Sequence, residues 1–184
     1  MDTQDKHFIV GIDLGTTNSA VSYVDLRESS PDHPEIQIFQ VPQLIAAGEV
    51  ARLPVLPSFA YIPGDYDLAK EDIRVPWPVA GDHVVGAFAR DHGASIPSRL
   101  ISSAKSWLCH AGVDRRAKIL PWGAGDDVRK VSPVEATSLY LAHLRSTWNA
   151  HWQEDESALE NQLVVLTVPA SFDEVARDLT VEGA

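Results

Sequence analysis

Three short runs of apolar residues with β-type patterning lie in the first forty positions of the chain. They cover residues 8–14, 19–26 and 36–41, and turn-forming residues separate them. The first two runs have the spacing of a hairpin, and the third can extend them into a meander. The pattern therefore predicts three antiparallel strands at the start of the chain.

Prolines dominate the next part of the chain and exclude long helices from residues 42–82. Residues 111–130 are mixed and rich in glycine, which is typical of a loop or hairpin. Between these segments, four apolar residues recur at helical spacing and predict a helix over residues 98–109: Leu100, Ile101, Ala104 and Leu108. The other expected elements are a strand at 58–62, a loop at 65–74, a short strand at 84–86 and a helix at 87–92.

A strong helix start stands at Ser132-Pro133-Val134-Glu135. Serine is a preferred cap, proline fits the first helical position, and glutamate three residues after the cap completes a capping box. We expect this helix to run to about Trp148 and to bury five side chains: Val134, Thr137, Leu141, Leu144 and Trp148.

Residues 163–168 are almost wholly apolar, a pattern that predicts a strand buried on both faces. We expect this strand to lie beside the first strand of the chain. Pro169 ends it, and Ser171 or Asp173 is expected to cap a last helix.

The formal net charge of −11 opposes the approach of nucleic acid and of anionic membranes, so neither is an expected partner. Cys109 is the only cysteine, so an intrachain disulfide is excluded and a reducing compartment fits. The polar N-terminus carries no signal-peptide core, and no later run reaches about 18 apolar residues. These features favour a cytoplasmic protein.

The most informative stretch is residues 11–19, where a strand-borne carboxylate precedes a Gly-Thr-Thr-Asn turn. Gly15 lets the backbone approach a ligand, and successive turn amides form a nest for an anion. Thr16, Thr17 and Asn18 add hydroxyl and amide donors. Asp13 is placed to hold a hydrated Mg²⁺ beside bound phosphates. The alternative interpretation is an ordinary hairpin turn that contains an aspartate.

Residues 9–22 resemble the first phosphate loop of the DnaK-type 70-kDa heat-shock chaperones, which are actin-like ATPases. Leu56-Pro57-Ser58 is similar to that family's Thr-Pro-Ser segment. Lys105 follows Gly86 by 19 positions and Pro97 by 8, the spacing of the family's catalytic lysine. Val168-Pro169-Ala170-Ser171-Phe172 resembles the family's Val-Pro-Ala-Tyr-Phe segment, and Arg177 follows Pro169 by 8 positions, as the family's arginine does. Ser171 and Ser106 depart from the family's tyrosine and arginine.

The resemblance implies a ribonuclease-H-like, actin-like ATPase α/β lobe: a mixed sheet with flanking helices and an inserted subdomain over about residues 42–130. Residues 1–184 would be a truncated N-terminal lobe, since the chain stops directly after an apolar helical pattern. ATP or ADP and Mg²⁺ are the implied ligands. A second lobe, a peptide-binding domain and co-chaperones are the implied partners, and a cytoplasmic chaperone of the stress response is the implied setting.

By the same resemblance, Lys105 faces the γ-phosphate and orients the attacking water, with Asp13 as its catalytic and metal-binding partner. Pro169 and Arg177 would be the switch proline and its relay. From the residues alone, Lys105 could equally be a solvated surface lysine, Pro169 the end of a buried strand, and Arg177 an exposed helical residue.

Four functions therefore stay open. The first is an ATPase that drives a chaperone cycle in the full-length protein. The second is a non-enzymatic nucleotide sensor or docking module on the same scaffold. A sugar kinase is the third, although Val168-Pro169-Ala170 favours the chaperone branch. A nuclease is the fourth, which the net charge disfavours. The family's second phosphate loop, Asp-Leu-Gly-Gly-Gly-Thr, does not occur in the sequence, so this chain alone is expected to be inactive or nearly so.

Overall fold

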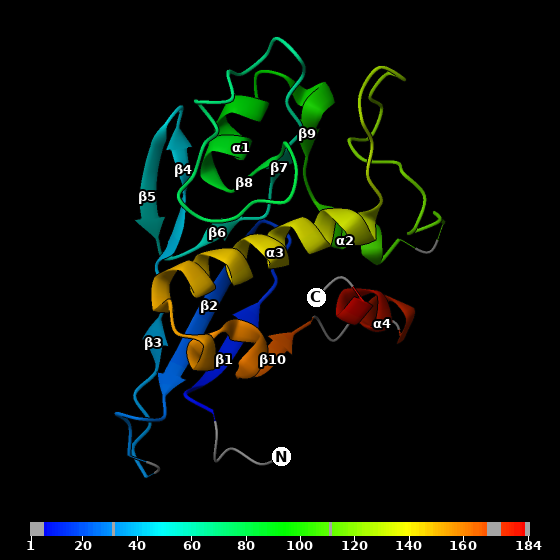
Figure 1. Ribbon diagram of the computed structural model, residues 1–184. Coiled ribbons are helices and arrows are strands. Elements are labelled where there is room, and N and C mark those ends of the chain that lie inside the picture. Colours follow the sequence, from blue (N-terminus) through cyan, green and yellow to red (C-terminus); the bar gives the residue numbers. More distant parts are fainter. Residues whose placement is uncertain (1–5, 31, 111, 169–173, 183–184) are drawn as a thin grey trace.

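The structure is a computed structural model that describes residues 6–30, 32–110, 112–168 and 174–182. One long helix, α3 (Pro133–Trp152), crosses the molecule. Figure 1 shows the strands β1, β2 and β10 on one side of this helix, and a group of small sheets with helix α1 (Ala87–Gly93) on the other. The architecture is mixed α/β with a mixed main sheet, as the sequence predicted.

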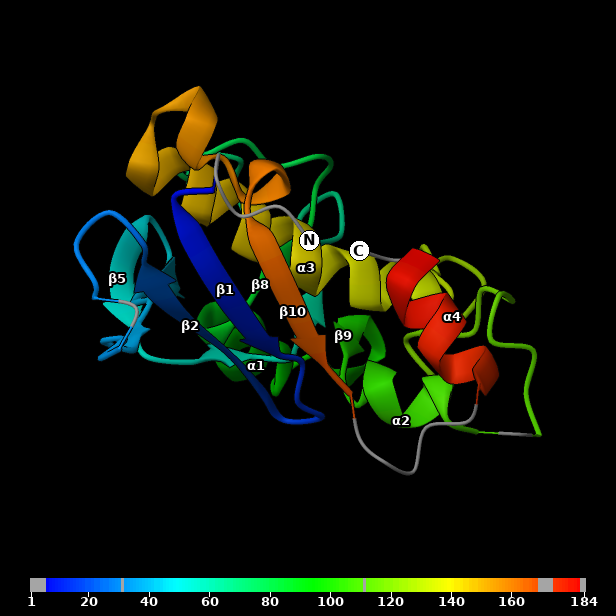
Figure 2. The ribbon, with the colours of Figure 1, turned by 90° about the horizontal axis from the view of Figure 1, so that it is seen from below.

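The main sheet has the strand order β10-β1-β2-β3. Strand β1 (Phe8–Asp13) pairs antiparallel with β2 (Asn18–Asp25) and parallel with β10 (Leu163–Thr167), and Figure 2 shows the three side by side. Two short strands complete the sheet, since β3 (Gln37–Ile38) and β6 (Leu56–Pro57) both pair with β2. The predicted antiparallel start and the predicted place of the last strand are confirmed. The third predicted strand is shorter than residues 36–41.

The prediction that residues 163–168 are buried on both faces is wrong. Val164 and Val165 are 38% and 50% exposed. The physical reason is the position of β10 at the edge of the main sheet, where β1 is its only strand partner among the described residues. An apolar run thus marks a strand here without marking its burial.

Two further β units follow, and the sequence analysis missed the first of them and one strand of the second. Strand β4 (Val41–Ala46) and strand β5 (Glu49–Leu53) make a hairpin, and Gly48 at its turn has a φ of 67°. Strand β7 (Ala60–Tyr61) is the centre of a three-stranded sheet between β8 (Val84–Val85) and β9 (Leu100–Ile101). The expected strands at 58–62 and 84–86 and the expected helix at 87–92 are present in this region.

The predicted helix over residues 98–109 is wrong in its first half. A 3₁₀ turn at Pro97–Arg99 leads into β9, and only α2 (Ala104–Leu108) is helical. Leu100 and Ile101 instead pair with Tyr61 and Ala60 of β7. Apolar positions at helical spacing also serve a short strand followed by a short helix, and tertiary pairing decides between the two.

Helix α3 begins as predicted. The Ser132 Oγ accepts from the backbone N–H of Glu135 at 3.1 Å, and the Glu135 carboxylate accepts from the backbone N–H of Ser132 at 2.7 Å. The five residues expected to be buried on this helix are all buried, and it runs four residues past Trp148. Near its end, Trp148 packs edge-on against Phe8 of β1 at 5.3 Å between ring centroids.

The remaining segments connect these elements. Residues 112–130 form an irregular loop in which Leu120 makes one isolated β-bridge with Val131. Two 3₁₀ turns, Asp155–Ser157 and Leu159–Asn161, lead from α3 to β10. Helix α4 (Glu174–Glu182) packs through Leu179 against Leu108 and Val134. No helix of the described segments is long and apolar enough to cross a membrane.

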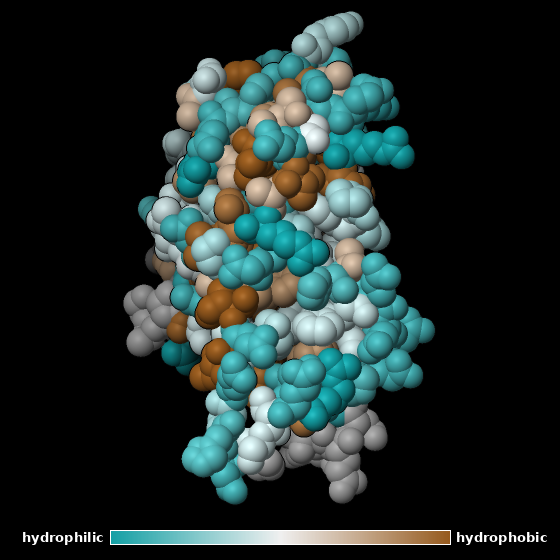
Figure 3. Space-filling view, turned by 90° about the vertical axis from the view of Figure 1, so that its left-hand side faces the viewer, coloured by the Kyte–Doolittle hydropathy of each residue, from teal (hydrophilic) through white to brown (hydrophobic). Residues whose placement is uncertain are grey.

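Apolar side chains also reach the surface in small groups. Figure 3 shows them as separate patches among polar residues on the face of the molecule where β5 lies. The most exposed large apolar residues of the described chain include Ile36 at 70% and Ile38 at 51%. The main core lies inside, between β1, β2 and one face of α3.

Candidate functional site

The turn between β1 and β2 presents its polar groups outward. Asp13 ends β1, and Thr16, Thr17 and Asn18 follow it; all four side chains are exposed. Leu14, between them, is 1% exposed and anchors the turn in the core. One buried side chain therefore fixes a surface made of a carboxylate, two hydroxyls and an amide.

Gly15 is required by the turn itself. A Cβ atom at this position would lie 1.9 Å from the backbone oxygen of Asn18, a distance that no side chain tolerates. The sequence analysis assigned Gly15 to close approach of a ligand. The structure adds a second reason, because only glycine lets the chain reverse so tightly between the two strands.

Ser58 holds this turn from a distant part of the chain. Its Oγ donates to the carbonyl oxygen of Gly15 at 2.8 Å, and its backbone N–H donates to the carbonyl oxygen of Thr17 at 2.8 Å. The Oγ atoms of Ser19 and Ser58 lie 3.0 Å apart, within hydrogen-bond distance. Ser58 is 1% exposed. The sequence analysis noted its Leu-Pro-Ser motif but gave Ser58 no role.

Thr167 is a second residue that sequence reasoning missed. It lies opposite Asp13 in the parallel pair of β10 and β1. Its Oγ1 is 3.0 Å from Asp13 Oδ1 and 3.3 Å from the carbonyl oxygen of Ile12. A hydroxyl donating to the carboxylate restricts its rotamers and leaves its second oxygen for another partner. Parallel neighbouring strands end at the same edge of a sheet. A polar residue near the end of the last apolar run was therefore the available signal.

Lys105 reaches the same turn from α2. Its side chain is buried, with 7% exposure, and Nζ donates a hydrogen bond to the carbonyl oxygen of Leu14. Burial lowers the pKa of the Lys105 ammonium, and the Asp13 carboxylate and Cys109 oppose that shift. The alternative of a solvated surface lysine is therefore wrong.

Of the two predicted switch residues, only Arg177 lies in the described part of the chain. Pro169, Ser171 and Asp173 lie outside the described residues. Arg177 is exposed on α4, the helix whose Leu179 packs against Leu108 of α2. The structure thus brings together Asp13, the 15–18 turn and Lys105, whereas Arg177 lies on a different helix, which packs against the one that carries Lys105.

The donor set of the turn suits a hydrated cation better than a directly coordinated one. Within the described segments, no group of three or more histidine, cysteine, aspartate or glutamate side chains could hold a metal. Asp13 contributes a single carboxylate, with threonine hydroxyls nearby. Mg²⁺ prefers oxygen ligands and keeps several waters when one or two carboxylates and a phosphate hold it. These residues fit Mg²⁺ bound through water together with phosphate groups.

Comparisons with known proteins point in one direction, although no family model matches the chain. It is 27% identical over 194 residues to the heat shock 70 kDa protein BIP3 of Oryza sativa subsp. japonica. It is 30% identical over 190 residues to a chaperone protein HscA homolog of Bordetella petrii, and 26% identical over 193 residues to chaperone protein HscA of Xenorhabdus nematophila.

These matches cover 96–97% of this chain and 24–25% of each relative, so the chain spans about a quarter of their length. The mixed α/β fold and the mixed main sheet agree with the actin-like ATPase fold that this relationship implies. The chain is therefore a homologue of the DnaK-type 70-kDa heat-shock chaperones and corresponds to an N-terminal lobe of that family.

Proposed function

We propose that this chain is a nucleotide-binding lobe that holds the phosphates of Mg-ATP on the turn between β1 and β2. One observation carries the proposal. The exposed Asp13, the donors of residues 15–18 and the buried Lys105 ammonium meet at one end of the main sheet. A cation and a set of donors at a fixed turn form an anion site in an otherwise acidic protein.

Each residue has a separate role in this proposal. The backbone amides and side chains of Thr16, Thr17 and Asn18 bind phosphate oxygens. Asp13 accepts hydrogen bonds from the waters of a bound Mg²⁺, and Thr167 keeps its carboxylate oriented. When bound, the metal neutralises phosphate charge. Ser58 keeps the turn in its binding shape before the nucleotide arrives.

Lys105 is the proposed catalytic residue. Its ammonium is removed from water, where a charge interacts more strongly with a developing negative charge than it does at the surface. In this proposal the ammonium, which contacts the carbonyl of Leu14, orients a water toward the γ-phosphate and stabilises charge that develops there. In the whole protein, this chemistry would be ATP hydrolysis that drives a chaperone cycle.

The rest of the whole protein is also part of the proposal. Residues 1–184 would form one lobe, with an inserted subdomain over about residues 42–130. ATP would lie between this lobe and a second one, and a peptide-binding domain and co-chaperones would be further partners. Pro169 and Arg177 would relay the nucleotide state to them. The name of the rice relative, a heat shock protein, suggests a role in heat stress. The proposed location is the cytoplasm, from the sequence features alone.

The binding proposal is tested by ³¹P NMR of ATP titrated with the chain, with and without Mg²⁺. We expect a dissociation constant no tighter than about 1 mM, because a single lobe lacks opposing contacts. Asp13→Ala should remove the part of the binding that depends on Mg²⁺. The matched control Asp126→Ala removes the same charge from an exposed loop position and should leave binding unchanged.

Two results would contradict the proposal. One is equal binding by Asp13→Ala and wild type in Mg²⁺, which would remove the turn from the site. The other is micromolar binding by the chain alone, which would favour a self-sufficient nucleotide sensor over a lobe that needs its partner.

A further inference from the structure

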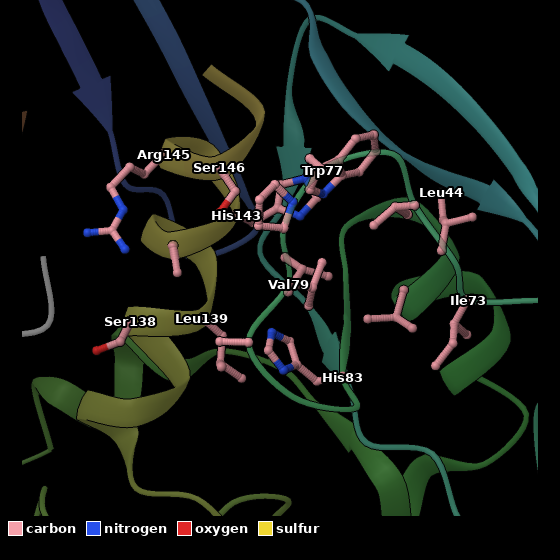
Figure 4. A pocket seen from close by; sticks show the side chains of 16 residues that line it. Leu44, Ile73, Trp77, Val79, His83, Ser138, Leu139, His143, Arg145 and Ser146 are labelled. Atoms are coloured by element: carbon pink, nitrogen blue, oxygen red, sulfur yellow. The ribbon is translucent and has the colours of Figure 1, made fainter. Parts of the chain in front are cut away.

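A cavity of about 390 Å³ lies between α3 and the segment of residues 73–85. Leu44 of β4 closes one side of it, and Figure 4 shows Ile73, Val79 and Leu139 around the same hollow. None of its lining residues belongs to the β1–β2 turn or contacts it through a described hydrogen bond. The cavity is therefore separate from the proposed nucleotide site.

The lining of this cavity is unusual for so acidic a chain. The sequence contains 26 aspartate and glutamate residues, yet none of them lines the cavity. Arg145 is its only residue with a permanent charge, and Figure 4 shows the guanidinium pointing away from the hollow. The space is thus bounded mainly by apolar side chains, with two imidazoles, those of His83 and His143, and two serines, Ser138 and Ser146.

The two imidazoles differ in what they offer to a ligand. His143 Nε2 donates to the carbonyl oxygen of Pro42 at 2.9 Å, and burial lowers the pKa of this ring to about 4. Burial, aided by Arg129, also lowers the pKa of His83, which makes no hydrogen bond to another side chain or backbone group of the described residues. Both rings are therefore neutral near pH 7, and His83 keeps a donor and an acceptor for a ligand.

Size and polarity together define the class of ligand. A dry apolar cavity of roughly 150 Å³ already accepts a benzene-sized molecule, and ligand sites begin at about 300 Å³. An anion would find no cation inside the hollow, and a cation would find no carboxylate. We propose that this cavity binds a small uncharged molecule with an apolar ring and one hydroxyl group. The ring lies between Leu44, Val79 and Leu139, and the hydroxyl bonds to His83.

A ligand in this cavity would bind between two parts of the fold, helix α3 and the segment of residues 73–85. The cavity is walled on one side by α3 and on the other by residues near the small β8-β7-β9 sheet. A ligand in the cavity contacts both sides at once and so restrains the segment of residues 73–85 against the helix. The inference does not depend on ATP binding at the turn.

The test uses 4-fluorophenol as the probe, observed by ¹⁹F NMR relaxation, with fluorobenzene as the matched probe without a hydroxyl. We expect 4-fluorophenol to bind with a dissociation constant on the order of 1 mM, and fluorobenzene to bind several-fold more weakly. Ala142 is exposed at the rim of the cavity, so Ala142→Trp should fill its mouth and abolish binding of both probes. Ala47→Trp places the same side chain on the exposed β4–β5 turn and should change nothing.

His83→Phe separates a specific site from simple apolar binding. This variant should bind 4-fluorophenol no better than fluorobenzene, while binding of fluorobenzene is retained. The inference is overturned if 4-fluorophenol shows no binding to wild type, or binds Ala142→Trp as well as Ala47→Trp. It is also overturned if His83→Phe leaves the preference for the hydroxyl intact. Thermal unfolding of each variant confirms that a loss of binding does not reflect a loss of fold.

Discussion

Ser58 donates a hydrogen bond from its Oγ to the carbonyl oxygen of Gly15 at 2.8 Å, across 43 positions of sequence. A second hydrogen bond, from the backbone N–H of Ser58 to the carbonyl oxygen of Thr17, holds the other end of the same turn. The segment after β6 thus fixes the shape of the turn before any ligand binds. Preorganisation of this kind lowers the free-energy cost of binding, because the turn does not have to be ordered by the ligand.

Ser58→Ala should therefore weaken the binding of ATP as well as the fold. The lost hydrogen bond is worth about 0.5–1.5 kcal/mol, which corresponds to a decrease in affinity of roughly 2- to 10-fold. Titration of ATP by ³¹P NMR measures the affinity, and urea unfolding measures the stability. Ser95→Ala, at an exposed position, is the control. Unchanged ATP affinity in Ser58→Ala would show that the hydrogen bond from Ser58 Oγ to Gly15 has no part in binding.

The partly buried ring of His143 predicts a loss of stability in mild acid. Its pKa is about 4 in the folded chain and about 6.5 when unfolded, so the unfolded chain takes up the proton first. Stability conferred by the neutral ring is complete above pH 6.5 and is lost as the pH falls toward 4. Between pH 7 and pH 5 this one group should cost about 2 kcal/mol of unfolding free energy.

Urea unfolding of wild type and His143→Gln at both pH values checks this. Glutamine keeps a donor for the Pro42 carbonyl but does not titrate, so the pH dependence of the variant should be smaller by that amount. His83, whose pKa burial also lowers, contributes in the same direction in both proteins, so the comparison reports His143 together with its electrostatic interaction with His83. An identical pH dependence in the two proteins would mean that His143 is not buried as the structure places it.

The capping box of α3 predicts a purely local effect on stability. Ser132→Ala removes the acceptor for the Glu135 N–H and should lower the unfolding free energy by about 1 kcal/mol. Ser98→Ala, at an exposed position of a 3₁₀ turn, should cost much less. Thermal or urea unfolding measures both. An equal loss of unfolding free energy in the two variants would show that the cap does not stabilise the helix.

The sequence predicted those features that depend on neighbouring residues. The capping box at Ser132, the β1–β2 hairpin and the polar turn between its strands all rest on local patterns, and the structure contains each of them. The place of β10 beside β1 was also predicted, from the order of the strands along the chain and the apolar run at residues 163–168.

The misses share one cause, which is contact between distant segments. Residues 98–109 carry a helical pattern, but pairing of Leu100 and Ile101 with β7 turns the first half into a strand. Thr167 bonds to Asp13 across 154 positions, a contact that no local window contains. The burial of Lys105 also depends on a distant segment, since its ammonium bonds to the carbonyl of Leu14, directly after β1.

The proposed catalytic role of Lys105 predicts a rate effect without a binding effect. We would measure it in a chimera in which this chain replaces the matching quarter of the Bordetella petrii relative. Lys105→Ala should lower single-turnover hydrolysis by roughly 100-fold or more, because a cation at the γ-phosphate acts mainly in the transition state. Affinity for ATP should stay nearly unchanged, since the 15–18 turn and Asp13 still hold the ground state. Asp13→Ala should lose both rate and Mg²⁺-dependent affinity.

Because Lys105 is buried, its removal also leaves space and an unpaired carbonyl at Leu14. Lys105→Met separates charge from packing, since methionine keeps an unbranched apolar stem but carries no charge. If the ammonium orients the reacting water, Lys105→Met should be as slow as Lys105→Ala. Recovery of the parental rate by methionine would assign the loss to packing. Lys70→Ala, at an exposed position, controls for the loss of one positive charge and should hydrolyse ATP at the parental rate. A parental rate in Lys105→Ala itself would remove Lys105 from the mechanism and favour a nucleotide sensor.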